Sequence, residues 1–263
     1  DQGLCKREDL WVTSKLWNTY HHPDHVKPAL EKTLQDLQLD YLDLYMIHFP
    51  ISLEFVPFDQ RYPPEWFNDP DSKEPVMIPS RVPLSDTWHA MEILKKEGLA
   101  KHIGICNYSS SLLHDLMNYC ETKPEILQVE SHPYLTQEKL IRLAKNYGLE
   151  VTAFSPLGSL SYEELGGAEE SESLLKNESI QSIAKDLDVS PAQLILSWAL
   201  NRGTSIVVKS SNEARMKENL DASIIKLDPF ILDQISALNI NKRYNDPGVF
   251  CEDAFNTFFP IYE

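Results

Sequence analysis

The sequence predicts an α/β fold built on a parallel sheet that helices cover. Strand-like stretches alternate with stretches of helical periodicity along most of the 263 residues, which is the pattern of repeated strand–helix units. No strand is followed by Gly-x-Gly-x-x-Gly, which an open dinucleotide-binding sheet would show. Polar side chains gather at the carboxyl ends of successive strands, where barrels of eight strand–helix units carry their sites. We therefore predict a (β/α)8 TIM barrel, of which six strands are visible in this chain.

The composition fits a single domain over residues 1–263. The chain is 42% hydrophobic and 10% aromatic, which allows a sizeable core in a barrel of this length. Its formal net charge of −16 argues against nucleic-acid and anionic-membrane partners, because both need clustered lysine and arginine. No apolar run approaches the roughly 20 residues that span a bilayer, and no signal peptide is visible. We expect a cytoplasmic protein, either a monomer or a homodimer.

The four cysteines are scattered along the chain. They form no Cys-x-x-Cys pair, and no histidine stands at metal-ligand spacing from them. Reduced thiols and no metal site are therefore the prediction.

The chain opens with a strand–helix–strand unit. Residues 10–17 have a strand pattern, and residues 24–39 carry apolar side chains at helical spacing, with Pro23 and Pro28 confining the start of the helix. Residues 41–50 then alternate as a strand that is buried on at least one face. The side chains expected to face the core from the helix are Val26, Leu30, Leu34 and Leu37. Such a unit is typical of parallel sheets.

Residues 51–83 lack periodicity and hold seven of the 17 prolines, together with several aromatic residues. A loop of this length inside a compact domain is often functional. Two interpretations stay open. The segment is either a variable surface excursion or a lid whose aromatic side chains face a substrate.

Beyond residue 83 helices and strands alternate again. Helices are predicted over residues 84–97, 109–119, 136–147, 173–187, 190–201, 212–220 and 228–238. The helix at 190–201 begins Ser-Pro-Ala-Gln, a capping box with proline at the first helical position. The six strands lie near residues 11–16, 42–47, 102–106, 126–130, 151–154 and 206–209. A Gly-, Ser- and Glu-rich loop over residues 158–172 and an aromatic tail complete the chain.

Each strand ends in side chains that can take part in chemistry. They are Lys15 and Trp17, then His48, then Asn107, then Gln128, Glu130 and His132, then Ser155, and finally Lys209 and Ser210. A surface charge would explain any single lysine, whereas six coincident strand ends indicate one shared site at the top of a barrel.

Seven motifs resemble the aldo-keto reductase family, and within it the aldose and xylose reductases. They are Lys6-Arg-Glu-Asp-Leu, Thr13-Ser-Lys-Leu-Trp, Leu42-Asp-Leu-Tyr-Met-Ile-His-Phe-Pro, Gly104-Ile-Cys-Asn-Tyr, Leu127-Gln-Val-Glu-Ser-His-Pro-Tyr, Thr152-Ala-Phe-Ser-Pro-Leu-Gly and Val208-Lys-Ser-Ser-Asn-Glu-Ala-Arg. They run through nearly the whole chain in family order. The tail Arg243-Tyr-Asn-Asp-Pro, and Phe49 after the histidine, resemble the xylose reductases.

The resemblance implies an oxidoreductase that reduces aldehydes and ketones with NADPH, with NADH as the alternative. The family uses an aspartate, a tyrosine, a lysine and a histidine, and here Lys15 matches the lysine and His48 the histidine. This division of labour is physically reasonable. Hydride adds to the carbonyl carbon while the oxygen gains a proton. A tyrosine can donate that proton when a nearby Lys⁺ lowers its pKa, and the histidine orients the carbonyl by a hydrogen bond.

The sequence departs from the family pattern at several positions. Cys106 stands where the family usually has serine. The family aspartate and tyrosine lie upstream of Lys6-Arg-Glu-Asp, after the second barrel strand, and no position in residues 1–263 matches them. We expect a preceding segment with both residues and the first two strands, and a naturally shortened, inactive product is the alternative. Residues 1–263 alone are expected to reduce xylose negligibly.

The resemblance also implies a cofactor site. Its positions are Asn107, Gln128, Phe154, Ser155, Leu157, Ser159, Lys209, Ser210, Ser211, Asn212, Arg215, Glu218 and Asn219. Asn107 and Gln128 match residues that hydrogen-bond the nicotinamide carboxamide, and Phe154 replaces a tyrosine that stacks on the ring. Lys209 and Arg215 supply positive charge in an acidic protein, which suits a 2′-phosphate and favours NADPH.

For the small-molecule carbonyl substrate, the resemblance points to Trp17, His48, Phe49 and Asn245. Asn245 matches a xylose-reductase position that meets sugar hydroxyls, which favours aldoses. Two other readings stay open. One is a catalytically incompetent barrel that binds NADPH and serves as a redox-sensing partner of another protein. The other is an unrelated barrel enzyme that binds a sugar phosphate near Lys209 and Arg215.

Overall fold

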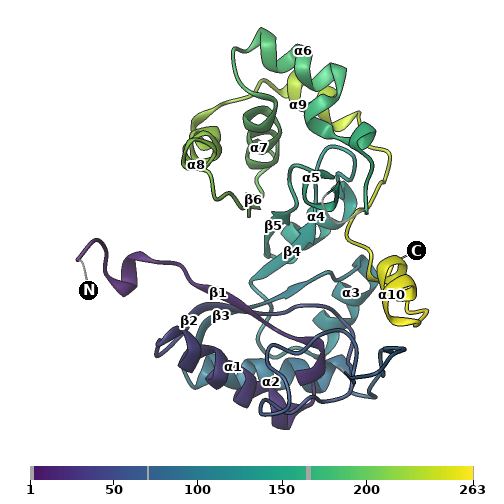
Figure 1. The fold of residues 1–263 in the computed structure, drawn as a ribbon. Helices are drawn as coiled ribbons and strands as arrows, with labels where there is room; N and C mark the ends of the chain where they lie inside the picture. Colours follow the sequence, from purple (N-terminus) through teal and green to yellow (C-terminus); the bar gives the residue numbers. More distant parts are fainter. Residues whose placement is uncertain (1–2, 70, 164–166, 263) are drawn as a thin grey trace. The chain divides into compact units, whose positions relative to one another are not determined.

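The computed structural model describes residues 3–69, 71–163 and 167–262 (Figure 1). The chain divides into two compact units. Among the described residues, unit 1 holds 3–69, 71–127 and 247–261, and unit 2 holds 128–163, 167–246 and 262. The fold is α/β, and neighbouring strands in the sheet are neighbours in the chain.

Unit 1 contains the first three strands and the helices between them (Figure 1). Its elements are η1 (Arg7–Asp9), β1 (Thr13–Leu16), η2 (Asn18–Tyr20), α1 (Pro23–Leu37), β2 (Leu42–Ile47), α2 (Leu84–Lys96), β3 (Ala100–Cys106), α3 (Ser110–Tyr119), the start of β4 (Ile126–Glu130) and α10 (Pro247–Phe255). β1 pairs with β2, and β2 pairs with β3, both in parallel. Helices α1 and α2 pack against each other.

All six residues of β2 are buried, as expected of a strand between two others in a sheet with both faces covered. Asp43 is the one ionisable carboxylate among them. It accepts hydrogen bonds from the Val12 N–H at 2.9 Å, from Arg7 Nη1 at 2.8 Å and from Lys101 Nζ at 3.3 Å. A buried charge is tolerated when it is paired and hydrogen-bonded in this way. Asp43 therefore fastens the segment that precedes β1 to β2.

Replacing Asp43 with asparagine is expected to lower the free energy of unfolding by about 2 kcal/mol at pH 7, because hydrogen bonds to a charged group are lost. Burial raises the pKa of Asp43, but the Val12 N–H, Arg7 and Lys101 together leave it below its ordinary value of 3.8. The stabilisation is therefore present above pH 3.8 and is lost as the pH falls through the lower folded-state pKa. Urea titrations at pH 7 and pH 3 would measure both quantities.

Asp36→Asn is the matched control, because the Lys32–Asp36 pair lies on the outer face of α1 and an exposed pair contributes little. We expect a change below about 0.5 kcal/mol for this variant. An Asp43→Asn deficit that stays equal at pH 7 and pH 3 would contradict the role given to the carboxylate.

Helix α1 differs from the sequence prediction at two positions. It begins at Pro23 as expected, but Pro28 lies inside the helix and not at its start. Leu37 was predicted to face the core and is 47% exposed. Leu37 is the last helical residue, and Gln38 turns the chain with a left-handed φ of 57°. The Leu39 N–H then bonds the Leu34 carbonyl at 3.0 Å, so Leu37 is left on the outside of the turn.

Residues 51–83 form the predicted loop, with no helix or strand in its described part beyond one isolated bridge between Leu53 and Pro79. The sequence analysis assigned no element to the aromatic tail, and the structure shows that part of it forms α10. The loop and α10 share a small apolar core of unit 1. Its buried members are Leu53, Met77 and Cys251, with Trp66, Phe255 and Phe259 packed around them.

Unit 2 contains the later strands and most of the remaining helices (Figure 1). Its elements are the rest of β4, α4 (Glu138–Asn146), β5 (Glu150–Phe154), α5 (Leu160–Glu163), η3 (Glu170–Glu172), η4 (Leu174–Lys176), α6 (Glu178–Asp186), α7 (Pro191–Asn201), β6 (Ser205–Ile206), α8 (Glu213–Asp221), η5 (Ala222–Ile224) and α9 (Pro229–Ser236). β5 and β6 pair in parallel.

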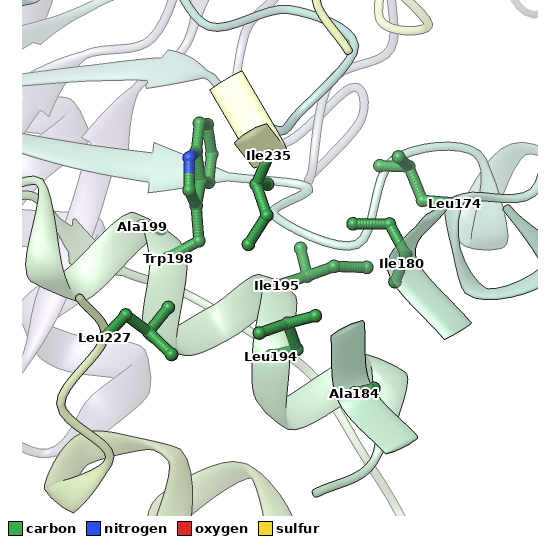
Figure 2. Packing of buried hydrophobic residues seen from close by; sticks show 9 residues of the cluster. All are labelled: Leu174, Ile180, Ala184, Leu194, Ile195, Trp198, Ala199, Leu227 and Ile235. Atoms are coloured by element: carbon green, nitrogen blue, oxygen red, sulfur yellow. The ribbon is translucent and has the colours of Figure 1, made fainter. Parts of the chain in front are cut away.

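Helix α7 lies at the centre of the unit 2 core. Ser190 and Gln193 form the predicted capping box, with Pro191 at the first helical position. Figure 2 shows Trp198 of α7 beside Ile235 of α9, with Leu194 toward α6. These side chains are buried completely, so α7 holds α6 and α9 together.

The six predicted strands are all present, and the last of them is shorter than expected. β6 ends at Ile206, not near residue 209. The helix predicted over 173–187 is divided into η4 and α6, because Asn177 caps α6 through bonds from the Ser179 and Ile180 N–H groups. The loop predicted over 158–172 includes α5 and η3, and its residues 164–166 lie outside the described residues.

Candidate active site and cofactor site

Lys15 and His48 stand at the ends of adjacent parallel strands of unit 1. Lys15 lies opposite Met46 in the register of β1 and β2, and the His48 N–H donates to the Leu16 carbonyl at 3.0 Å. The end of β2 is thereby held beside the end of β1. Lys15 is half-buried, and within the described part of the chain no carboxylate forms an ion pair with it.

The environment of His48 keeps its imidazole neutral. Burial, and then the positive charge of Lys15, lower the pKa of His48 to about 3. A neutral imidazole donates from one ring nitrogen and accepts at the other. His48 can therefore donate a hydrogen bond to a carbonyl oxygen throughout the physiological pH range.

An aromatic wall surrounds this histidine. The ring of Phe49 stacks on His48 at 4.9 Å between centroids, and Trp17 meets His48 edge-on at 5.2 Å. Trp66, in the loop of residues 51–83, packs on Trp17 with 4.9 Å between the ring centroids, and it also contacts Phe250 of α10. Predicted substrate residues Trp17, His48 and Phe49 are thus in mutual contact within unit 1. A cavity of about 280 Å³ beside Lys15 and Trp17 adjoins this wall.

The end of β3 contributes Asn107 and Cys106. Asn107 is buried with a left-handed φ of 63°, a conformation that asparagine tolerates, and its Nδ2 donates to the His48 carbonyl at 2.8 Å. The thiol of Cys106 lies 3.8 Å from the Met46 sulfur in the interior. Burial raises the pKa of Cys106 to about 12 despite the charge of Lys15, so this thiol is protonated and packs as a small apolar group.

In unit 2 some of the predicted cofactor residues line two cavities. One, of about 220 Å³, is lined by Phe154, Ser155, Leu157 and Lys209, among others. The other, of about 570 Å³, is lined by Lys209, Ser210 and Asn219, among others. Lys209 therefore contributes to both cavities. Gln128 and Ser159 are buried in the same unit.

The second cavity adjoins the N-terminus of α8. Asn212 caps the helix by accepting the Arg215 N–H at 3.0 Å, and Ser210 Oγ accepts the Asn212 N–H at 3.1 Å. Ser211 is exposed and Glu218 half-buried. Lys209 and Arg215 are exposed, and neither pairs with a carboxylate in the ranges that the structure describes. Two unpaired cations at a helix N-terminus favour an anionic ligand.

Asn245 also lies in unit 2, where Glu130 binds its backbone N–H at 3.0 Å. Sequence reasoning noted Glu130 and His132 at a strand end but gave them no role, and it did not single out Tyr162. Tyr162 lies in a segment without periodicity, so no pattern marks it. Among the described residues no group of three or more His, Cys, Asp and Glu could hold a metal ion. In that same part of the chain no helix is long and apolar enough to cross a membrane.

Comparison with known proteins identifies the family. Residues 4–240 match the model of the aldo/keto reductase family. The chain is 46% identical over 263 residues to the NAD(P)H-dependent D-xylose reductase of Kluyveromyces lactis, covering 98% of this chain and 79% of that protein. It is 44% identical over 262 residues to an NADPH-dependent aldose reductase of Saccharomyces cerevisiae, covering 98% of this chain and 80% of that one.

Solved structures agree with the sequence comparison. The aldose reductase of Giardia lamblia matches with a TM-score of 0.82 at 33% identity, covering 100% of this chain and 82% of that one. The aldose reductase of Schistosoma japonicum matches with a TM-score of 0.81 at 33% identity, covering 98% and 77%. The six parallel strands are thus those of an aldose reductase barrel. The chain belongs to the aldo/keto reductase family, in the branch that contains the xylose and aldose reductases.

Proposed function

We propose that this protein reduces aldehydes and aldoses, including xylose-like sugars, to alcohols with NADPH. The observation that carries the proposal is the pair Lys15 and His48, which end adjacent strands of unit 1 beside an aromatic wall. The relatives support it, since they include an NAD(P)H-dependent D-xylose reductase and an NADPH-dependent aldose reductase.

The chemistry assigns a separate role to each group. NADPH, when bound, supplies the hydride. The neutral His48 donates a hydrogen bond to the carbonyl oxygen and so holds the carbon in line for addition. As charge develops on that oxygen, a tyrosine must release a proton, and the charge of Lys15 lowers the pKa of such a donor. Lys15 and His48 are the two catalytic positions of the family that residues 1–263 match.

The residues of unit 2 fit NADPH. Phe154 can stack on the nicotinamide, Gln128 can bond its carboxamide, and the cavity beside Ser155 suits a pyrophosphate. The unpaired Lys209 and Arg215 at the start of α8 suit the 2′-phosphate, because a guanidinium binds phosphate oxygens in two parallel hydrogen bonds.

Replacing Arg215 with alanine is expected to weaken NADPH binding by roughly 10- to 100-fold, because a charge-assisted contact to the 2′-phosphate is lost. NADH lacks that phosphate, so its affinity should stay within about twofold. Titrations that follow the quenching of tryptophan fluorescence by each cofactor would measure both affinities. Lys217→Ala, which removes an exposed charge from the same helix, is the control. Equal losses for NADPH and NADH would contradict the assignment of Arg215.

The reaction itself is tested by supplying the donor. A segment carrying the family aspartate and tyrosine, taken from the Kluyveromyces lactis enzyme, would be joined ahead of residue 4. We expect this extended chain to oxidise NADPH with xylose and residues 1–263 to do so negligibly. Full activity of residues 1–263 would show that another group protonates the product. NADPH binding without turnover, in a protein proved to begin at Asp1, would instead favour a redox-sensing binding protein.

A further inference from the structure

Glu130 is a fully buried carboxylate at the end of β4. It accepts hydrogen bonds from two consecutive backbone N–H groups of a distant segment, Tyr244 at 2.8 Å and Asn245 at 3.0 Å. His132 Nε2 lies 3.0 Å from the same carboxylate, and the Arg243 guanidinium 3.7 Å from it. These partners compensate the cost of burying the charge. The segment 243–245 is therefore fastened to the sheet of unit 2 at its main chain.

The side chain of Asn245 is held at a second point. Its Nδ2 donates to the Tyr162 hydroxyl at 3.1 Å, and that hydroxyl lies 3.1 Å from Ser155 Oγ. Tyr162 also stacks on Tyr244, with ring centroids 5.9 Å apart. The main chain of residue 245 is thus fixed by Glu130 and its amide plane by Tyr162.

The remaining polar atom of the Asn245 side chain is the amide oxygen Oδ1, which is a hydrogen-bond acceptor. This oxygen is buried and has no hydrogen-bond partner among the residues that the structure describes. A buried unsatisfied acceptor costs free energy that a correctly placed donor would recover. A hydroxyl group of a sugar is such a donor, whereas an unsubstituted alkyl chain is not.

We propose that Glu130 is a positioning residue: by fixing Asn245 it sets the preference for carbonyl substrates that bear hydroxyl groups over those that do not. The identity of the reaction rests on the proposed function, while the clamp rests on the contacts within unit 2. Glutamine at position 130 would keep the shape of the side chain but replace one acceptor oxygen by an N–H donor, which faces an amide N–H of the tail or His132. The tail would then lose an anchor while Asn245 itself remains.

Hydrogen exchange in the 263-residue chain tests the clamp without any turnover. Glu130→Gln is expected to speed exchange of the Tyr244 and Asn245 amides at least about tenfold, with α7 unchanged. Unchanged exchange at these two amides, or equal acceleration throughout unit 2, would overturn the proposal. Tyr162→Phe removes only the hydroxyl contact and serves if Glu130→Gln does not fold. In that variant the Asn245 side-chain amide protons are expected to exchange faster, while the two backbone amides stay protected.

Substrate preference tests the consequence. In the extended chain described above, Glu130→Gln is expected to lower kcat/KM for xylose about tenfold through KM, with kcat/KM for butanal and the NADPH affinity within about twofold. Equal losses for xylose and butanal would mean that Glu130 is merely structural. If the extended chain without the substitution reduces neither xylose nor butanal, the proposed function is refuted. The clamp is then judged by exchange alone, where acceleration confined to residues 243–246 supports it and any other result refutes it.

Discussion

Replacing Lys15 with methionine is expected to lower kcat for xylose about 1,000-fold in the extended chain that carries the family aspartate and tyrosine. Methionine keeps most of the length of the side chain and removes its charge. Without that charge the pKa of the donor tyrosine rises, and proton donation to the developing alkoxide becomes slow. The loss corresponds to about 4 kcal/mol of transition-state stabilisation. Steady-state kinetics with xylose and NADPH would measure it.

The affinity for NADPH separates this effect from a loss of folding. Its expected change is within about twofold, because Lys15 belongs to unit 1 and acts on the developing charge and not on the cofactor. Lys96→Met, at an exposed position in the last turn of α2, is the control and should leave kcat unchanged. If the Lys15→Met variant has the same kcat as the extended chain without the substitution, Lys15 has no role in the reaction.

The repeated strand–helix order could be read from the sequence because its signals are local. Ser190 and Gln193 form their capping box within one turn, so the start of α7 was predicted correctly. The strand at 42–47 was also placed correctly, since residues 41–50 alternate with the period of a strand and Phe49-Pro50 ends it. Such elements are specified by neighbours in the chain.

The elements that were missed depend on distant contacts. Helix α10 has little helical pattern of its own, and its aromatic residues pack on the loop of residues 51–83, where Phe255 lies 5.3 Å from Phe67. Pro28 suggested a helix start, yet α1 continues through it, because the buried side chains of Val26 and Leu30 hold the helix on either side.

In the candidate site too, the features set by local patterns could be predicted and those set by distant contacts could not. Lys15 and His48 could be placed at strand ends from periodicity, and parallel pairing of consecutive strands brings such ends together. The low pKa of His48 could not be predicted, because it follows from burial and from the charge of Lys15 on the neighbouring strand. The contacts of Glu130 could not be predicted either, because its partners lie 114 and 115 residues further along the chain.

Replacing Trp198 with alanine is expected to destabilise the protein by about 3–5 kcal/mol, because it leaves a large cavity at the centre of the unit 2 core. The indole is completely buried beside Ile235 (Figure 2). Its Nε1 donates to Ser236 Oγ at 3.0 Å, and the Arg202 guanidinium lies 4.4 Å from the ring. Each of these contacts is lost in the variant. Urea denaturation followed by far-ultraviolet circular dichroism would measure the change.

Trp11→Ala is the matched control, since Trp11 is 59% exposed and its ring stacks on His102 with 5.1 Å between the centroids. Its cost should not exceed about 1 kcal/mol. The pair of variants also tests the prediction of a single domain. In one cooperative domain Trp198→Ala shifts the whole transition, because a loss in unit 2 is shared by unit 1. Two transitions, with only one shifted by Trp198→Ala, would mean that the two units unfold separately. The proposed cofactor residues of unit 2 would then unfold while Lys15 and His48 keep their places in unit 1.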